Sequence, residues 1–550
     1  MKLTDISMNF TRNGEYFAVS LTSDCTKEGV EFRLTDTADR FALDISTDEE
    51  IVIKGIRATF SYDFDPDCRI FLNGYQSWTS CREHTTVGRL HGIYRLPRAL
   101  VDRFAFDKYG DYTFVTYGRR AGQLHGFTYG YIRVGEEFFL LGSTAEQSGY
   151  TLIRTDTREK TVKLEKDCPG HTVKGEYKIF DVALLTGSED YVFDRYFELL
   201  GVPKCTVPRI NGYTSWYNRY EDISEESVLS DLAGFADQER LPDVFQIDDG
   251  YESAVGDWLS VDPHKFPSGM KEIADKIAAA GMKPGIWLAP FAAEKESALV
   301  REHPEWLLRD DKGEPVVGGS NWSGFYGLDI YNEELREYLR KVFKTVIDEW
   351  GYRLLKLDFL YACSIVPRRD KTRAEVMYDG MDFIRELCGE VPVIGCGVPL
   401  APAFGKVEYC RIGCDVSLSW DDALYMRPMH SERPSTKKTV LNTIFRRELD
   451  GRAFRCDPDV YLLRDDNIRL TAQEKKTLAV VNALFGGVLF TSDDPASYSP
   501  EAKKVFDTVM KLTRNDFTGL VYENRVVTVK YLEDGAPSSV SITLGTLRGN

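Results

Sequence analysis

The sequence predicts a multidomain α/β plus β fold, with an N-terminal β-sandwich, a central (β/α)8 barrel and a short C-terminal β region. Three observations support this prediction. Short alternating apolar runs fill residues 1–200, and strand and helix patterns alternate over residues 201–515. Residues 516–550 return to a strand pattern. We take these three ranges as the expected domains, with a linker at the end of the first.

The N-terminal range reads as many short antiparallel strands, which is typical of a sandwich. Asn-Gly turn signals separate them, and no strong helical period occurs before about residue 190. Residues 73–80 are an exception, because they pack aromatic and amide side chains into a turn-like stretch. Trp78 in this stretch is either a core residue or part of a loop that reaches a neighbouring domain.

After a helix near residues 191–200, the pattern changes to alternating strands and helices. Their number and length match a (β/α)8 barrel. The expected strands are 210–217, 244–249, 284–289, 354–359, 393–397, 411–416, 453–457 and 488–493. Expected helices include 270–280, 333–349, 373–388, 439–449, 474–484 and 501–512.

The last expected strands lie at 521–522, 526–531 and 540–544. This region is too short for an independent domain, so we expect a small sheet packed on the barrel. The whole chain has 550 residues, 43% of them hydrophobic, which is enough for several packed cores.

Composition excludes some classes of partner. The net charge of −17 argues against nucleic acid, since a phosphate backbone requires a basic face. No run approaches the ~18 apolar residues that span a bilayer, and residues 1–10 hold no apolar signal core. The eleven scattered cysteines contain no CxxC pair, which indicates reduced thiols rather than disulfides or zinc. We expect a cytoplasmic protein with no membrane partner and no metal.

The strand at 354–359 carries two ionisable side chains at alternate positions, Lys356 and Asp358. Both therefore point to the same face, where an unpaired charge is costly to bury. A structural ion pair is one interpretation. A functional site is the other, and it gains support because other expected strands also end in polar residues.

Barrel active sites are built at the C-terminal ends of several strands. Carboxylates that grip hydroxyls, beside aromatic faces that stack on sugar C–H surfaces, suit a pyranose pocket. The candidates at these ends are Trp216, Tyr217, Asp248, Asp249, Trp287, Lys356, Asp358, Cys396, Arg411 and Asp415. Asp457 and Asp493 are interpreted as helix-capping or supporting groups.

Two carboxylates are also what glycoside cleavage requires. Asp358 is the better nucleophile candidate, because Lys356 two residues earlier favours its ionised form. Asp415, four residues beyond Arg411, is the acid/base candidate. Spacing alone does not separate the two roles.

Six ordered segments resemble glycoside hydrolase family 36, the α-galactosidases and their relatives, and residues 73–78 resemble part of that family's N-terminal β-domain. The segments are Trp216-Tyr217-Asn218, Gln246-Ile247-Asp248-Asp249-Gly250-Tyr251, Gly256-Asp257-Trp258, Lys283-Pro284-Gly285-Ile286-Trp287, Lys356-Leu357-Asp358 and Arg411-Ile412-Gly413-Cys414-Asp415.

The resemblance implies a retaining double displacement with Asp358 as nucleophile and Asp415 as acid/base. It also assigns sugar-binding roles. Asp248 and Asp249 would bind the 4- and 6-hydroxyls, and Lys356 and Arg411 would bind other polar edges. Trp216 and Trp287 would form walls around the sugar, and Tyr217 is a further substrate-binding candidate. Trp78 would approach from the N-terminal domain, and Cys396 and Gly397 match the segment near the 2-position. Among departures from the family, Tyr251 stands where many members have Trp.

The expected function is a retaining exo-α-galactosidase acting on terminal α-linked galactose of oligosaccharides or glycoconjugates. One alternative is an α-N-acetylgalactosaminidase, which needs room beside Cys396. Others are a galactosyl transferase of raffinose-synthase type and a catalytically silent carbohydrate-binding protein. The mechanism requires no metal or organic cofactor. Whether the protein forms a homo-oligomer is left open.

Overall fold

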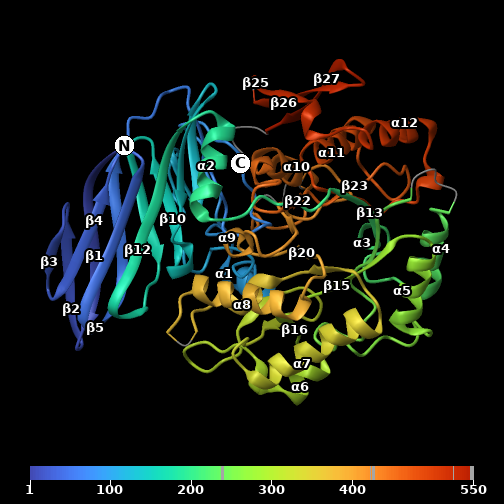
Figure 1. Cartoon of the computed structure of the whole chain (residues 1–550), viewed down its shortest axis with the longest axis horizontal. Coiled ribbons are helices and arrows are strands. Elements are labelled where there is room, and N and C mark those ends of the chain that lie inside the picture. The colour runs from blue at the N-terminus through green and yellow to red at the C-terminus, as the bar shows by residue number, and fades with distance from the viewer. Residues whose placement is uncertain are drawn as a thin grey trace.

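The computed structural model describes residues 1–236, 241–368, 370–421, 423, 426, 428–523 and 525–544 (Figure 1). It contains a β-rich N-terminal region, a central parallel sheet surrounded by helices, and a small C-terminal sheet. This architecture confirms the predicted fold class. The expected C-terminal range 516–550 includes residues 524 and 545–550, which lie outside the described residues.

Twelve antiparallel strands form the N-terminal region, and their alternating burial follows the sequence pattern. Apolar residues on β1, β8 and β11, such as Met8, Ile132 and Leu164, lie in one buried cluster, so the sheet folds over on itself as a sandwich. The strands are β1 (Lys2–Arg12), β2 (Glu15–Leu21), β3 (Cys25–Lys27), β4 (Val30–Asp36), β5 (Arg40–Ser61), β6 (Arg69–Leu72), β7 (Gln123–Phe127), β8 (Tyr129–Val134), β9 (Glu137–Ser143), β10 (Tyr150–Asp156), β11 (Thr161–Asp167) and β12 (Thr172–Gly187).

The long strand β5 organises this sandwich. Its first half pairs with β4 and β12, and its second half pairs with β1 and β11. A short helix α1 (Arg98–Phe104) lies in the long connection between β6 and β7, where the sequence predicted no helix. Helix α2 (Glu189–Leu200) then ends at Gly201, whose left-handed φ of 68° suits the helix terminus.

The central sheet is parallel throughout, and each expected strand corresponds to an observed one. They are β13 (Ile210–Thr214), β14 (Val244–Ile247), β15 (Lys283–Leu288), β19 (Leu354–Leu357), β20 (Val393–Gly395), β21 (Tyr409–Arg411), β22 (Arg455–Asp457) and β24 (Val488–Thr491), with β23 (Val460–Tyr461) beside β24. Strands β22 and β23 are the two edges of the sheet and are consecutive in the chain, so their connection brings the edges together.

Two expected strand ends are wrong. The strand predicted at 210–217 ends at Thr214, and Trp216 and Tyr217 begin helix α3 (Trp216–Arg219). The strand predicted at 411–416 is β21 at 409–411, so Asp415 lies in the following loop. In both places the polar, cavity-facing end of the strand leaves the sheet before the pattern indicates.

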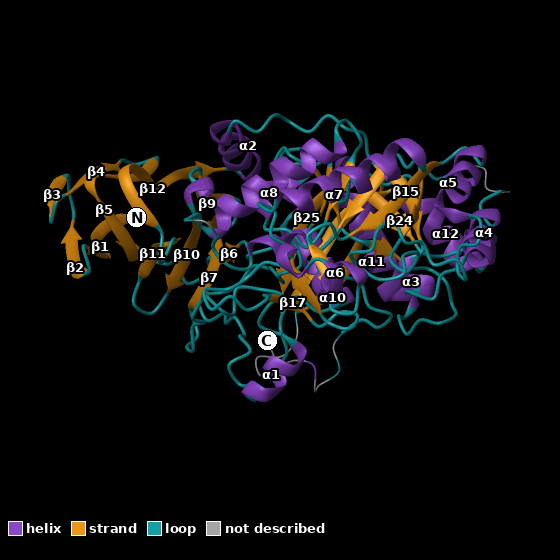
Figure 2. Cartoon of the chain, turned by 90° about the horizontal axis from the view of Figure 1, so that it is seen from below, coloured by secondary structure: helices purple, strands orange, loops and turns teal. Residues whose placement is uncertain are grey.

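The helices surround the parallel strands (Figure 2). Several begin at capping boxes; for α8, Thr372 and Glu375 satisfy each other's backbone N–H groups. The helices are α4 (Glu225–Ala233), α5 (Gly269–Ala279), α6 (Ala298–Glu302), α7 (Glu333–Lys344) with a π-helical turn at Thr345–Glu349, α8 (Arg373–Cys388), α9 (Leu400–Ala403), α10 (Thr436–Phe445), α11 (Ala472–Phe485) and α12 (Pro500–Val509). Short 3₁₀ turns occur at Glu146–Ser148, Pro304–Trp306, Leu360–Ser364, Arg447–Leu449, Pro495–Ser497 and Arg514–Asp516.

Two small antiparallel sheets complete the fold. One, which the sequence did not predict, lies in the connection after β15 and comprises β16 (Ala292–Glu294), β17 (Val317–Gly319) and β18 (Phe325–Gly327). The other comprises β25 (Phe517–Glu523), β26 (Val526–Glu533) and β27 (Ala536–Thr543) and packs near α11 (Figure 1). Among the described residues, no helix is both long and apolar enough to cross a membrane.

A buried arginine joins the N-terminal region to the barrel. The Arg446 guanidinium donates to the Asn73 side-chain oxygen (3.0 Å), the Ser77 carbonyl (2.6 Å) and the Gln76 carbonyl (3.1 Å). Arg446 is fully buried, so these bonds satisfy donors that water cannot reach. The 73–80 stretch therefore contacts the barrel, in agreement with the interpretation that it is a loop reaching a neighbouring domain.

Candidate active site

A cavity of about 340 Å³ opens at the C-terminal edge of the parallel strands. Strand ends and the loops that follow them supply one side, and the N-terminal region supplies Trp78 and Tyr109. The barrel residues predicted from sequence that line it are Trp216, Asp248, Asp249, Trp287, Lys356, Asp358 and Asp415. The fold thus brings together seven candidates from five strand ends.

Asp358 follows β19 and is held on both carboxylate oxygens. Oδ1 accepts a hydrogen bond from the Phe359 backbone N–H (2.9 Å), and Oδ2 accepts one from Nε1 of Trp287 (3.2 Å). Phe359 has a left-handed φ of 52°, which turns the chain sharply after the carboxylate. Each oxygen keeps a lone pair for another partner. The carboxylate is therefore oriented before any substrate arrives.

Burial raises the pKa of Asp358 above its ordinary value of 3.8. The Lys356 ammonium opposes this shift, and the nearby Asp415 carboxylate adds to it. The two candidate carboxylates are thus close enough for their charges to interact.

Lys356 pairs with Asp248 rather than with Asp358. Its Nζ lies 2.8 Å from Oδ2 of Asp248, and both side chains are buried. The same oxygen accepts from Nε2 of Gln246 (2.7 Å) and Oγ1 of Thr214 (3.1 Å). Burial alone would lower the pKa of Lys356, but the Asp248 carboxylate raises it above the ordinary value, so the ammonium stays charged. Lys356 therefore does form an ion pair, but it joins the ends of two different strands and lies on the cavity wall.

Asp249 faces a second buried carboxyl, Glu252. Oδ2 of Asp249 accepts from Nε1 of Trp322 (2.8 Å), whereas Glu252 accepts no hydrogen bond of normal geometry among the described residues. Burial raises the pKa of Glu252 to about 7, and burial together with the Glu252 charge raises the pKa of Asp249. Two buried carboxyls in contact favour one shared proton. Sequence reasoning passed over Glu252.

Asp415 is the most exposed of these carboxylates, with 38% of its side chain accessible. Its Oδ1 accepts from Nη1 of Arg411 at 2.8 Å, and its backbone carbonyl accepts from the Ser435 N–H at 2.8 Å. One oxygen is therefore anchored while the group remains open to the cavity. This geometry suits proton exchange with a bound molecule.

Arg411 does not line the cavity. Besides Asp415, its guanidinium contacts Asp457 (3.1 Å) and Asp459 (2.9 Å), so three carboxylates share its donors. Tyr217 is also buried behind the cavity wall, where its hydroxyl donates to Asp459. Neither Arg411 nor Tyr217 is among the residues that line the cavity, and their contact with a sugar stays a prediction. Both hold the network that positions Asp415.

Cys396 and Gly397 lie beneath Trp78. The Trp78 Nε1 donates to Sγ of Cys396 at 3.3 Å, and Cys396 is fully buried. A Cβ at Gly397 would stand 2.8 Å from Cζ2 of Trp78. Neither residue is among those that line the cavity, and their place near the sugar 2-position stays a prediction. Trp78 forms the wall at this position instead.

Sequence reasoning missed the cavity residues that come from long loops. Tyr109, in the β6–β7 connection, donates its hydroxyl to Oδ1 of Asn321 (2.6 Å) and accepts from the Ser320 N–H (2.8 Å). The remaining missed residues are Glu221, Trp322, Phe359, His430, Glu432, Arg433 and Pro434. Only the tryptophan gave a signal, since an indole in a polar loop is unusual. Among the described residues, no cluster of three or more His, Cys, Asp or Glu side chains could hold a metal ion.

Known proteins match this chain in two ways. The melibiase family model matches residues 211–378. A bifunctional α-galactosidase/sucrose kinase from Mediterraneibacter gnavus is 27% identical over 189 residues, which are 32% of this chain and 19% of that protein. The sequence matches thus cover only about a fifth of such curated relatives.

Solved structures match over almost the whole chain. An α-galactosidase from Thermus thermophilus is 25% identical, with a TM-score of 0.71 over 97% of this chain and 98% of that one. The family 36 α-galactosidase AgaA from Geobacillus stearothermophilus, at 13% identity and a TM-score of 0.61, shares the fold over 92% of this chain and 71% of its own. In sequence over part of its length, and in fold over almost all of it, the chain is similar to α-galactosidases, among them a member of glycoside hydrolase family 36.

Proposed function

We propose that the protein is a retaining exo-α-galactosidase that hydrolyses terminal α-linked galactose from oligosaccharides or glycoconjugates. The main support is that Asp358 and Asp415 line one cavity and their charges interact, as a two-carboxylate mechanism requires. The similar Thermus thermophilus structures hold p-nitrophenyl α-D-galactopyranoside and stachyose, which is consistent with a galactoside substrate here.

In the first step, a carboxylate oxygen of Asp358 attacks the anomeric carbon and the bond to the leaving oxygen breaks. Protonated Asp415 gives its proton to that oxygen. The product is a β-galactosyl ester on Asp358.

In the second step, Asp415 takes a proton from water, whose oxygen attacks the anomeric carbon and displaces Asp358. The carboxylate of Asp415, whose Oδ1 stays anchored to Nη1 of Arg411, acts as the base in this step. Two inversions release galactose as the α-anomer.

The sugar would lie between Trp216, Trp287 and Trp322, with the Asp248–Lys356 pair and Asp249 available to its hydroxyls. With C2 facing Cys396, an acetamido group would meet Trp78, which covers that thiol. This favours galactose over N-acetylgalactosamine. Transfer to a sugar acceptor would use the same residues, and no contact described above favours it.

The deciding experiment compares p-nitrophenyl α-galactoside with the α-N-acetylgalactosaminide and follows the released anomer by NMR. We expect cleavage of the first with α-galactose appearing before mutarotation. Initial release of the β-anomer would contradict retention. Preference for the second substrate would contradict the assignment of the C2 wall, and no cleavage of either would contradict the hydrolase.

A further inference from the structure

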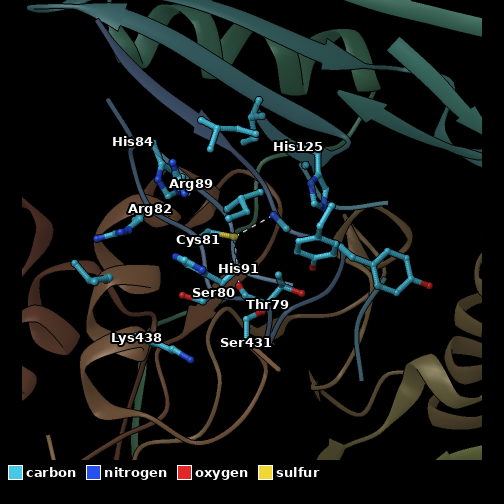
Figure 3. Close-up of a pocket in the computed structure, with 18 of the residues that line it drawn as sticks. Thr79, Ser80, Cys81, Arg82, His84, Arg89, His91, His125, Ser431 and Lys438 are labelled. Carbon is cyan, nitrogen blue, oxygen red and sulfur yellow. Dashed lines mark hydrogen bonds between the residues drawn. The ribbon is translucent and has the colours of Figure 1, made fainter. Parts of the chain in front are cut away.

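A second cavity, of about 300 Å³, lies between the N-terminal β-region and the barrel (Figure 3). The segment 72–91, strand β7 and the residues around the start of α10 form its walls. Its described lining includes Arg82, Arg89, Arg433, Lys437 and Lys438 but only two acidic residues, Asp111 and Asp421. Positive charge therefore concentrates here in a chain of 86 acidic and 69 basic residues.

The two acidic residues already have partners. Asp111 accepts from the Tyr117 hydroxyl (2.7 Å) and lies 3.0 Å from Nε2 of His125. Asp421 pairs with Lys437 at 3.1 Å. Among the described ion pairs, neither carboxylate is joined to Arg82 or Arg89.

Arg82 and Arg89 form no ion pair within the ranges that the structure describes. Arg82 donates to the Leu544 carbonyl at 3.2 Å, and burial lowers its pKa to about 10. A guanidinium removed from water without a counter-charge is costly. The missing negative charge is what a bound anion would supply.

Neighbouring groups are suited to an anion with several oxygens. His84 lies beside the two arginines (Figure 3), and burial lowers its pKa to about 3, so it is a neutral imidazole with one N–H to donate. Ser431 and Lys438 face the cavity from the barrel side (Figure 3). Two guanidinium groups and an imidazole N–H are donors of the kind that bind a phosphate group.

Part of the lining is apolar. Leu72, Leu90, Leu124 and Leu441 face the same space, so an occupant would carry a compact organic body as well as its anionic group. A volume of about 300 Å³ is at the lower end of small-molecule sites, which suits a ligand of monosaccharide size.

This cavity is distinct from the sugar cavity. Of the residues lining the two, Arg433 is shared, and the other named residues of each wall differ. Two segments separate them. Trp78 faces the sugar cavity and Thr79 and Ser80 the second one, while His430 and Glu432 face the sugar cavity and Ser431 the second one.

We propose that the second cavity is a binding site for a small phosphate monoester of about monosaccharide size, with its phosphate group held by Arg82, Arg89 and His84. This site goes beyond glycoside cleavage and does not depend on it. A ligand here would contact both domains at once.

The test is isothermal titration of the full-length protein with glucose 6-phosphate, with and without excess galactose. We expect saturable 1:1 binding that galactose does not displace, and no binding of glucose. Loss of binding in galactose would place the ligand in the sugar cavity and overturn the proposal. Inorganic phosphate is the second probe, and an affinity equal to that of the ester would overturn the assignment to an ester.

The variant Arg89→Glu should weaken ester binding by about tenfold or more, because it reverses one charge of the phosphate site. Arg89 is exposed, so folding should be preserved. Arg158→Glu makes the same charge change on an exposed turn outside the cavity and should bind like the wild type. Arg82→Gln is the second site variant. Unchanged affinity in both site variants would overturn the proposal.

Discussion

The indole N–H of Trp78, from the N-terminal region, donates to the Cys396 sulfur in the barrel across 3.3 Å. This contact links a β-domain loop to the end of β20 and covers Cys396, which the proposed function puts near C2 of the sugar. Substrate choice is therefore expected to depend on a residue outside the barrel.

The variant Trp78→Ala should uncover Cys396. We expect kcat/KM for the α-galactoside to fall by about tenfold or more, and its ratio to that for the N-acetylgalactosaminide to fall as well. Trp78→Phe keeps an aromatic cover and should retain the wild-type ratio. If the alanine variant kept that ratio, Trp78 would not set the preference at C2.

The variant Asp358→Ala should lose turnover by about 10⁴-fold or more, since no group replaces the nucleophile. Azide added with an activated galactoside should restore part of the rate by entering the vacated space. Its product should be β-galactosyl azide, identified by NMR. The α-azide would show that the nucleophile lies elsewhere.

The variant Asp415→Ala should distinguish substrates by their leaving groups. Raffinose hydrolysis, which needs protonation of a poor leaving group, should fall by about 10²- to 10⁴-fold. The first step with 2,4-dinitrophenyl α-galactoside, measured by kcat/KM, should be slowed far less, because this leaving group needs little protonation. Arg411→Lys keeps the positive charge but loses the planar guanidinium that contacts Asp415. It should also slow raffinose hydrolysis more than hydrolysis of the activated galactoside, by a smaller factor. Equal losses on both substrates would contradict the acid role.

The acidic limb of the kcat/KM profile should report Asp358. Its pKa is raised by burial, and attack requires the ionised form, so kcat/KM should fall as pH drops through a value above 3.8. Lys356→Met removes a charge that opposes this shift and should move the limb upward by about one unit. Lys356→Arg keeps the charge and serves as control. If the acidic limb of the methionine variant stayed at the wild-type pH, the charge of Lys356 would not affect the pKa of Asp358.

Protein stability should report the Asp249–Glu252 pair. The pKa of Glu252, about 7 in the folded protein against an ordinary 4.5, means that its contribution is fully present below pH 4.5 and is lost as pH rises through 7. Glu252→Gln removes this titration and should raise the apparent Tm at pH 8 by about 1–3 °C. The gain over the wild type should shrink toward pH 4. A gain independent of pH would contradict the shared proton.

Strand periodicity and chain order were enough to predict the barrel and to bring Asp248, Asp358 and Asp415 to one edge. They were insufficient where the chain leaves the sheet. Arg411 and Tyr217 follow the same pattern as the cavity residues, yet their side chains turn inward because Asp457 and Asp459 offer buried partners. The alternation of residues along a strand predicts which face of the sheet a side chain points to. It does not predict the ion-pair partner, because that partner comes from a neighbouring strand.

The loop residues were beyond such reasoning for a different reason. Tyr109 and Trp322 come from connections without periodic pattern, and each is placed by a hydrogen bond to a distant residue. The ion-pair partner of Lys356 could not be predicted either. Asp248 is 108 positions away in the sequence, and the strand pattern does not favour it over Asp358 as the partner.

The hydrogen bonds from Arg446 to residues 73–77 also determine when this loop can reach its final position during synthesis. Asn73 and Arg446 are separated by 373 positions, so at about 5–20 residues per second the loop emerges roughly 20–75 seconds before its anchor. Throughout that interval the N-terminal sheet can form while Trp78 has no barrel to rest on. The sugar-binding wall therefore becomes complete only when most of the chain has left the ribosome.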